Sequence, residues 1–168
     1  MMPSLYAITV PVFTRALRNL DHFLAKAADS GLDAQDLLEA RLAPDMLPLT
    51  RQVQIACDSA KLAITRLAQT APRPMADEEK SLAELRDRIA RTIAYLEEAD
   101  PAAFEGRETA EIRVKFPTRE MVFTGQSLIT DFSLPNVFFH VTTVYALLRM
   151  KGVALGKMDY LAGGQDIG

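Results

Sequence analysis

The sequence predicts a mainly all-α fold: a four-helix bundle with one extra short helix and a small β-hairpin before the last helix. Three observations support this prediction. Four long stretches repeat apolar residues at three- and four-residue steps, which is the period of an amphipathic helix. One short stretch alternates apolar and polar residues, as a half-buried strand does. The 168 residues, 49% of them hydrophobic, suffice for one continuous core, so we expect a single domain over residues 1–168.

The first helical stretch contains a proline, Pro11, so we expect either a kink there or a helix that begins near it. Gly31 is expected to end this helix, and Asp33 to cap a short helix that includes Leu37. His22 falls on the polar face, where we expect a plain surface residue. The apolar face consists of Leu5, Ile8, Val12, Ala16, Leu20, Phe23 and Ala27.

The second long helix is expected to start at Pro48, a favoured first-turn residue, and to run to about Thr70. The third has Ser81 as its N-cap with Glu84 completing a capping box, and it stops before Pro101. The core faces of these two helices are Leu49, Val53, Ala56, Ala60, Ile64 and Leu67, and then Leu82, Leu85, Ile89, Ile93 and Leu96.

Residues 111–123 alternate apolar and polar residues around a turn at Pro117-Thr118, which predicts a hairpin. Because a lone hairpin is not stable in water, it must pack on the bundle or pair with another chain. The last helix is expected from about Gln126 to Lys151, with a kink or break at Pro135. We expect the tail from about residue 162 to 168 to fray.

Composition excludes several classes of function. The 19 basic residues are scattered in a chain of net charge -3, so no nucleic-acid footprint stands out. No apolar stretch approaches the ~20 residues that cross a bilayer, and Met1-Met2-Pro3-Ser4 does not begin a secretory signal. The lone Cys57 fits a reducing compartment, so we expect a cytoplasmic protein.

Most catalytic templates are missing. The chain has no glycine-rich phosphate loop, nucleophile elbow, Cys-x-x-Cys, His-x-x-x-His or Glu-x-x-His. A di-iron bundle needs the Glu-x-x-His pattern on two helices, so this class of protein is excluded. Cys57 neighbours a core face and is expected to be inert packing. The pair Glu78-Glu79 precedes a helix and is expected to be solvated charge.

His140 is one of two histidines in the chain and shares a helix face with Val137, Val141 and Val144. The favoured interpretation is a core histidine whose nitrogens are satisfied by hydrogen bonds. The alternative is a metal ligand or an acid–base group, because histidine titrates near neutral pH and a core pocket can tune it.

A polar stripe runs along the second long helix beside its apolar face. The simplest interpretation is a solvated face with weak pairs worth ~0.2–0.5 kcal/mol each. In the alternative interpretation, the stripe lines a cleft in which Gln54 and Asp58 approach His140. Asp45 then lies at the rim of this cleft, and Arg51 holds a carboxylate or phosphate. The stripe consists of Arg51, Gln54, Asp58, Lys61 and Thr65.

Short segments along nearly the whole chain carry a family resemblance. They are Val10-Pro11-Val12-Phe13, Arg41-Leu42-Ala43-Pro44-Asp45-Met46, Arg51-Gln52-Val53-Gln54, Phe104-Glu105-Gly106, Phe123-Thr124-Gly125, Leu134-Pro135-Asn136, Phe138-Phe139-His140, Gly156-Lys157 and Asp159-Tyr160-Leu161. With these segments and its order of elements, the chain resembles an uncharacterised branch, a domain of unknown function, of the DinB/YfiT-like superfamily of four-helix bundles.

The resemblance implies the fold but not the chemistry. Characterised members of the superfamily are metal-dependent enzymes, including thiol S-transferases and a maleylpyruvate isomerase, that bind one divalent metal through a histidine on the second bundle helix and a His-x-x-x-His pair on the last. Here His140 matches the first of that pair, Val144 stands at the second, and Gln52 and Gln54 lie near the remaining position. That is a poor ligand set for zinc or nickel, so we predict no cofactor, with His140 the only candidate ligand.

These observations leave three functional hypotheses. The leading one is a bundle without a metal that holds a small anionic ligand in its central cleft. The second is a metal-dependent hydrolase or thiol S-transferase with one weakly held zinc or nickel at His140. The third is a non-enzymatic dimeric interaction protein. We expect a homodimer, but dimer formation is compatible with all three hypotheses and does not discriminate among them. The candidate ligand-binding residues are Asp45, Arg51, Gln54, Asp58, Asn136 and His140.

Overall fold

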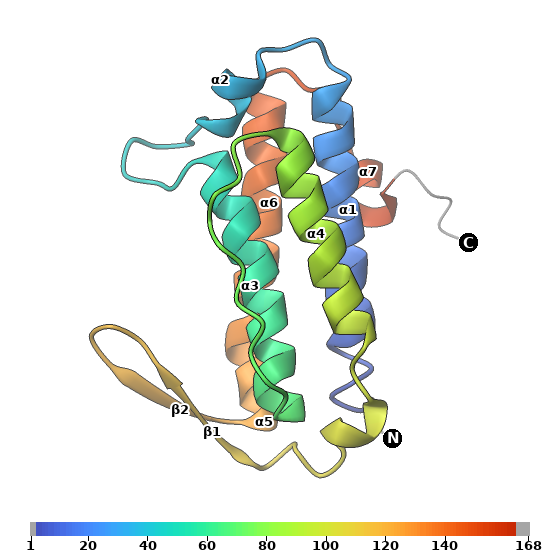
Figure 1. Ribbon diagram of the computed structural model, residues 1–168, viewed down its shortest axis with the longest axis vertical. Helices are drawn as coiled ribbons and strands as arrows, with labels where there is room; N and C mark the ends of the chain where they lie inside the picture. Colours follow the sequence, from blue (N-terminus) through green and yellow to red (C-terminus); the bar gives the residue numbers. More distant parts are fainter. Residues whose placement is uncertain (1–2, 164–168) are drawn as a thin grey trace.

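The computed structural model describes residues 3–163. Four long helices form a bundle in which α1 and α6 run in one direction and α3 and α4 in the other (Figure 1). Helix α3 packs against both α4 and α6, and α1 packs against the same two helices, which closes the bundle. The predicted fold class is confirmed. The long helices are α1 (Val10–Ala28), α3 (Leu49–Ala68), α4 (Leu82–Glu97) and α6 (Leu134–Met150).

Shorter elements connect the four long helices or pack on their outer surfaces. They are α2 (Ala34–Leu38), the 3₁₀ turn η1 (Pro101–Phe104), the strands β1 (Glu111–Lys115) and β2 (Glu120–Thr124), α5 (Gly125–Ser127), the π-helical turn η2 (Leu128–Ser133) and α7 (Lys157–Ala162). Among the described residues, none of these helices is long and apolar enough to cross a membrane. Of the tail expected to fray, Ala162 belongs to α7, while residues 164–168 lie outside the described residues.

The apolar faces predicted from the sequence meet in one core. Leu20, Val53, Ile89 and Val141, one from each long helix, are all at most 2% exposed. Cys57 lies fully buried among them, and burial raises the pKa of its thiol to about 12, so it is inert packing.

The helix termini follow local chemistry. The side chain of Asp33 accepts from the backbone N–H of Asp36 at 2.7 Å, as expected of an N-cap. Ser81 likewise accepts from the N–H of Glu84 at 3.2 Å, but the Glu84 carboxylate accepts from the N–H of Lys80 rather than completing the predicted capping box. Pro48 is the N-cap of α3 rather than its first helical residue.

The two helix prolines act differently. Pro11 lies in the first turn of α1, so the helix begins near it and does not kink. Pro135 lies in the first turn of α6, directly after η2. Because proline has no N–H to donate to the carbonyl four residues earlier, the helical hydrogen bonds before it widen into a π turn. Ser133 is the last residue of that turn.

The hairpin has the predicted position and packs on the bundle at η2. Cross-strand partners Ile112 and Phe123 lie directly opposite each other. Phe116 and Phe123 both contact Phe132 of η2, with ring centroids 5.6 Å and 5.7 Å from it. Where the chain re-enters the bundle, a Cβ at Gly125 would lie 2.0 Å from the carbonyl oxygen of Arg107, so only glycine fits there.

Helix α7 packs across the outer face of α1, beside it in Figure 1. Asn19 donates from Nδ2 to the carbonyl of Tyr160 at 2.6 Å, and the Tyr160 ring stacks on Phe23 at 6.0 Å. His22 Nε2 lies 2.7 Å from Asp159 Oδ1. His22 is therefore not the plain surface residue that we expected, because a helix from the end of the chain covers it.

Candidate functional site

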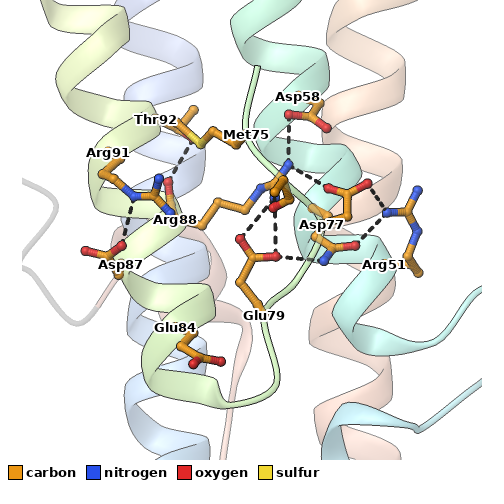
Figure 2. Close-up of polar contacts among 12 residues, drawn as sticks. Arg51, Asp58, Met75, Asp77, Glu79, Glu84, Asp87, Arg88, Arg91 and Thr92 are labelled. Atoms are coloured by element: carbon orange, nitrogen blue, oxygen red, sulfur yellow. Dashed lines mark hydrogen bonds and ion pairs between the residues drawn. The ribbon is translucent and has the colours of Figure 1, made fainter. Parts of the chain in front are cut away.

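A buried arginine connects α3, α4 and the segment between them. This residue was not identified from the sequence. Arg88 of α4 is 0% exposed. Its Nη2 lies 3.0 Å from Asp58 Oδ1 of α3 and 3.0 Å from Asp77 Oδ1 of the segment between α3 and α4. Its Nη1 donates to Glu79 Oε1 at 3.0 Å and to the carbonyl of Ala76 at 3.0 Å (Figure 2). One guanidinium thus joins both helices to the connecting segment.

The polar stripe of α3 completes this network. Gln54 Nε2 donates to Glu79 Oε2 at 2.8 Å, and Arg51 Nη1 donates to Gln54 Oε1 at 2.6 Å and to Asp77 at 2.5 Å. Lys61 Nζ donates to the carbonyl of Arg73 at 2.9 Å. The stripe is therefore neither a solvated face nor a wall facing His140, because it holds the chain's own segment 70–81, which runs along α3 in Figure 1. We call Arg51, Gln54, Asp58, Lys61, Asp77, Glu79 and Arg88 the Arg88 cluster.

Electrostatics stabilise the charged forms in the Arg88 cluster. Burial by itself would lower the pKa of Arg88, but its hydrogen bond to Glu79 and the charge of Asp58 outweigh burial and raise that pKa. Burial would raise the pKa of Glu79, but hydrogen bonds from Gln54 and Arg88 lower it. Burial would likewise raise the pKa of Asp77, but Arg51 and Arg88 lower it. Every one of these side chains is ionised at neutral pH.

The Arg88 cluster balances its own charge. Its three carboxylates, Asp58, Asp77 and Glu79, face three cations, so no charge is left over for a ligand. Glu79 has a side chain only 6% exposed, which corrects the solvated charge expected at Glu78-Glu79. Arg51, expected to hold an anionic ligand, already donates to Asp77 and Gln54.

His140 occupies a different part of the bundle. It is 8% exposed, and its Nδ1 lies 2.6 Å from Gln52 Oε1. Gln52 Nε2 donates to the carbonyl of Leu47 at 3.1 Å, so its oxygen faces the ring and Nδ1 is the donor. Burial lowers the pKa of His140, so the imidazole is neutral. This geometry matches the favoured interpretation of a core histidine, and His140 does not meet Gln54 or Asp58.

The donors around His140 do not fit a divalent metal. Nδ1 carries the proton that it donates to Gln52, which leaves one ring nitrogen and a neutral amide. Among residues 3–163, no group of three or more histidine, cysteine, aspartate or glutamate side chains is arranged to hold an ion. Zinc and nickel sites in proteins use more numerous imidazole, thiolate or carboxylate ligands.

The two remaining candidates have different surroundings. Asp45 is exposed in the loop between α2 and α3. Asn136 of α6 donates from Nδ2 to Ser59 Oγ of α3 at 2.8 Å. Asn136 and Asp58 both line one cavity, of about 290 Å³, where α3, β1, η2 and α6 meet. We call this cavity the hairpin pocket.

The hairpin pocket combines unpaired polar groups with apolar walls. Ile55, Leu62, Val114, Phe116 and Phe132 supply apolar surface. The polar lining comes from Asp58, Ser59, Arg66, Lys115, Ser133 and Asn136.

Arg66 and Ser133 stand out within this lining. Arg66 has no hydrogen-bond or ion-pair partner among the described residues, although burial lowers its pKa. Its place in the last turn of α3 favours a cation, but the helix dipole does not replace lost hydration. Ser133 is 1% exposed, and its hydroxyl has no partner within residues 3–163. Native proteins rarely leave such a hydroxyl unsatisfied.

The charge of the hairpin pocket is positive. Lys115 at its exposed rim makes no ion pair with any described residue, as is true of Arg66. The only carboxylate in the lining, Asp58, is already neutralised by Arg88 at 3.0 Å and Lys61 at 3.3 Å. The pocket therefore presents a half-buried guanidinium beside apolar surface, which is the composition of a site for an organic anion.

Comparison with known proteins gives a family and a fold. The family described as Domain of unknown function (DUF1993) matches residues 5–161. A crystal structure of a DinB family member protein from Shewanella denitrificans is 40% identical in sequence, with a TM-score of 0.85, and the match covers 98% of this chain and 95% of that one. No functionally curated protein matches the chain.

Proposed function

Because the chain belongs to the DUF1993 family of DinB-like helical bundles, whose description names no activity, we propose from its own geometry that it binds a small organic anion in the hairpin pocket. The observation that carries the proposal is the half-buried Arg66, which has no counterion among the described residues and lines a cavity with apolar walls. A bound carboxylate supplies the missing partner of Arg66.

This proposal moves the anion from the central cleft to the hairpin pocket. The charge balance of the Arg88 cluster argues against Arg51 and Gln54 as ligand-binding residues, since a ligand would have to displace Asp77 and Glu79. Two of the original candidates, Asp58 and Asn136, line the hairpin pocket and stay in the proposal.

The pocket has a size and place suited to this role. A volume of about 290 Å³ is near the lower end of small-molecule sites, so the ligand is smaller than a typical drug. The proposal is for a cytoplasmic protein, which the single, buried thiol of Cys57 supports. Nothing around His140 favours the metal-dependent alternative, and dimer formation stays a prediction.

Titration calorimetry with a panel of benzoate, phenylacetate, succinate and inorganic phosphate tests the proposal. We expect at least one of these anions to bind the wild-type protein. Arg66→Met should weaken that binding ~10- to 100-fold, because a hydrogen bond to a charged group is worth ~1.5–3 kcal/mol.

The matched control is Arg91→Met on α4. Arg91 is an exposed arginine paired with Asp87 at 2.8 Å and takes no part in the hairpin pocket. Its variant should bind as the wild type does. Equal affinity in wild type and Arg66→Met, or no binding of any anion in the panel to the wild type, contradicts the proposal.

A further inference from the structure

The hairpin pocket has an aromatic wall. Phe116 and Phe132 both line it, and their rings meet edge to face with centroids 5.6 Å apart. Phe132 is held from a second direction by Phe123, at 5.7 Å. A ring fixed in this way by two neighbours presents a defined face and edge to whatever fills the cavity, and aromatic partners prefer such offset or edge-to-face contacts.

The charged groups set the number of charges that a ligand can carry. Arg66 is the one half-buried cation of the lining, whereas Lys115 is exposed at the rim, where water screens its charge. The carboxylate of Asp58 forms part of the same wall. Arg88 and Lys61 already pair with this carboxylate, so Arg66 is left as the one half-buried cation for a ligand, and one negative charge is favoured over two.

The hydrogen-bonding groups favour a planar acid group. A guanidinium such as that of Arg66 forms parallel bonds to the two oxygens of a carboxylate. The remaining walls, Ile55, Leu62 and Val114, offer only apolar surface, which suits the body of the ligand.

We infer that the hairpin pocket binds an aromatic monocarboxylate, with its carboxylate on Arg66 and its ring against Phe116 and Phe132. This inference rests on the proposed function and makes it specific. It distinguishes the ligand from phosphate, from dicarboxylates and from aliphatic acids of the same size. The hairpin that supplies Phe116 is therefore part of the proposed binding site.

A matched set of acids tests the inference. Benzoate and cyclohexanecarboxylate carry the same charge on bodies of similar size, but only the first has an aromatic ring. We expect wild-type protein to bind benzoate about fivefold more tightly than cyclohexanecarboxylate, as aromatic pair contacts predict. The preference should disappear in Phe116→Leu, while both acids still lose affinity in Arg66→Met.

Because Phe116 also helps to hold the hairpin, saturation-transfer NMR on the wild type gives a readout that needs no variant. The strongest transfer should fall on the ring protons of benzoate.

The possible results separate the two claims. Equal binding of both acids, with both weakened by Arg66→Met, overturns the aromatic class and leaves the proposed function standing. Tighter binding of succinate or inorganic phosphate than of benzoate has the same meaning. No binding of any of these anions overturns both.

Discussion

Arg88 shows how a single side chain can determine the path of a connection. Its guanidinium extends from α4, is fully buried, and bonds to α3 and to the segment between the two helices. A buried charge is tolerated only when its partners are in place, so the segment from residue 70 to 81 must lie where it does. The Arg88 cluster therefore specifies the path of the connecting segment rather than adding net stability, because a buried ion pair does not always stabilise more than an apolar replacement.

Removing Arg88 while keeping its partners should be strongly destabilising. Arg88→Met leaves Asp58, Glu79 and Asp77 without their shared cation, and we expect the free energy of unfolding to fall by ~3–5 kcal/mol. Urea denaturation followed by circular dichroism measures this change. Arg91→Met, on the exposed side of the same helix, should change it by no more than ~0.5 kcal/mol. Similar losses in the two variants would show that the Arg88 cluster has no special role.

At this scale the sequence allowed some predictions and concealed others. The core position of His140 followed from helical spacing alone. Arg88 is three residues from Leu85 and four from Thr92 and so lies on the apolar face of α4, a signal that was present in the sequence. Arg66 and Ser133 carried no comparable signal, because their environment exists only after the hairpin folds onto α3 and η2.

At the scale of elements, α7 is a helix that the sequence analysis did not predict. It is only six residues long, but its side chains find partners on α1. Asp159 accepts from Lys26 at 3.2 Å, lies 2.7 Å from His22, and also accepts from the N–H of Gly156 at 2.7 Å. Long-range partners of this kind cannot be read from periodicity.

The docking of α7 should depend on pH through Asp159. Burial would raise the pKa of this carboxyl, but hydrogen bonds from His22, Gly156 and Lys26 lower it from 3.8 to about 2. A depressed folded-state pKa stabilises the docked form above pH 3.8, and this contribution is lost as the pH falls from 3.8 towards 2. Hydrogen exchange of the α7 amides should therefore be slow at pH 5 and become less protected below pH 3.8.

Asp159→Asn isolates this contribution. At pH 5 the variant should show α7 amides less protected by ~1.5–3 kcal/mol, the range for a hydrogen bond to a charged group. Asp87→Asn, which alters a carboxylate exposed on α4, should leave α7 unchanged. If Asp159→Asn protects α7 as well as the wild type at pH 5, the carboxylate does not hold the helix.

The hairpin illustrates what an element's own sequence does and does not contain. Alternation of apolar and polar residues predicted both strands, and Pro117-Thr118 predicted the turn between them. The hairpin packs on Phe132, which lies in the π turn just before Pro135. Pro135 was identified as a point where the helix kinks or breaks, but a π turn was not predicted there from the sequence.

At the scale of the whole molecule, the order of elements and the four apolar faces were enough to predict a DinB-like bundle. They did not locate the candidate site, because a polar stripe on one helix can be covered by the segment that connects this helix to the next. Here segment 70–81 occupies the polar stripe of α3, and the hairpin forms the cavity that is left. Homodimer formation stays a prediction that sedimentation equilibrium can test.

The central claim is that an anion binds in the hairpin pocket and not at the Arg88 cluster. Two-dimensional ¹H–¹⁵N NMR of the uniformly labelled protein during a benzoate titration tests it most directly, because it locates the ligand without a variant. We predict saturable shifts concentrated at Arg66, Lys115 and Ser133, with little change around Arg51 and Asp77. Shifts centred on Arg51 and Asp77, or no saturable shift anywhere, would contradict the account.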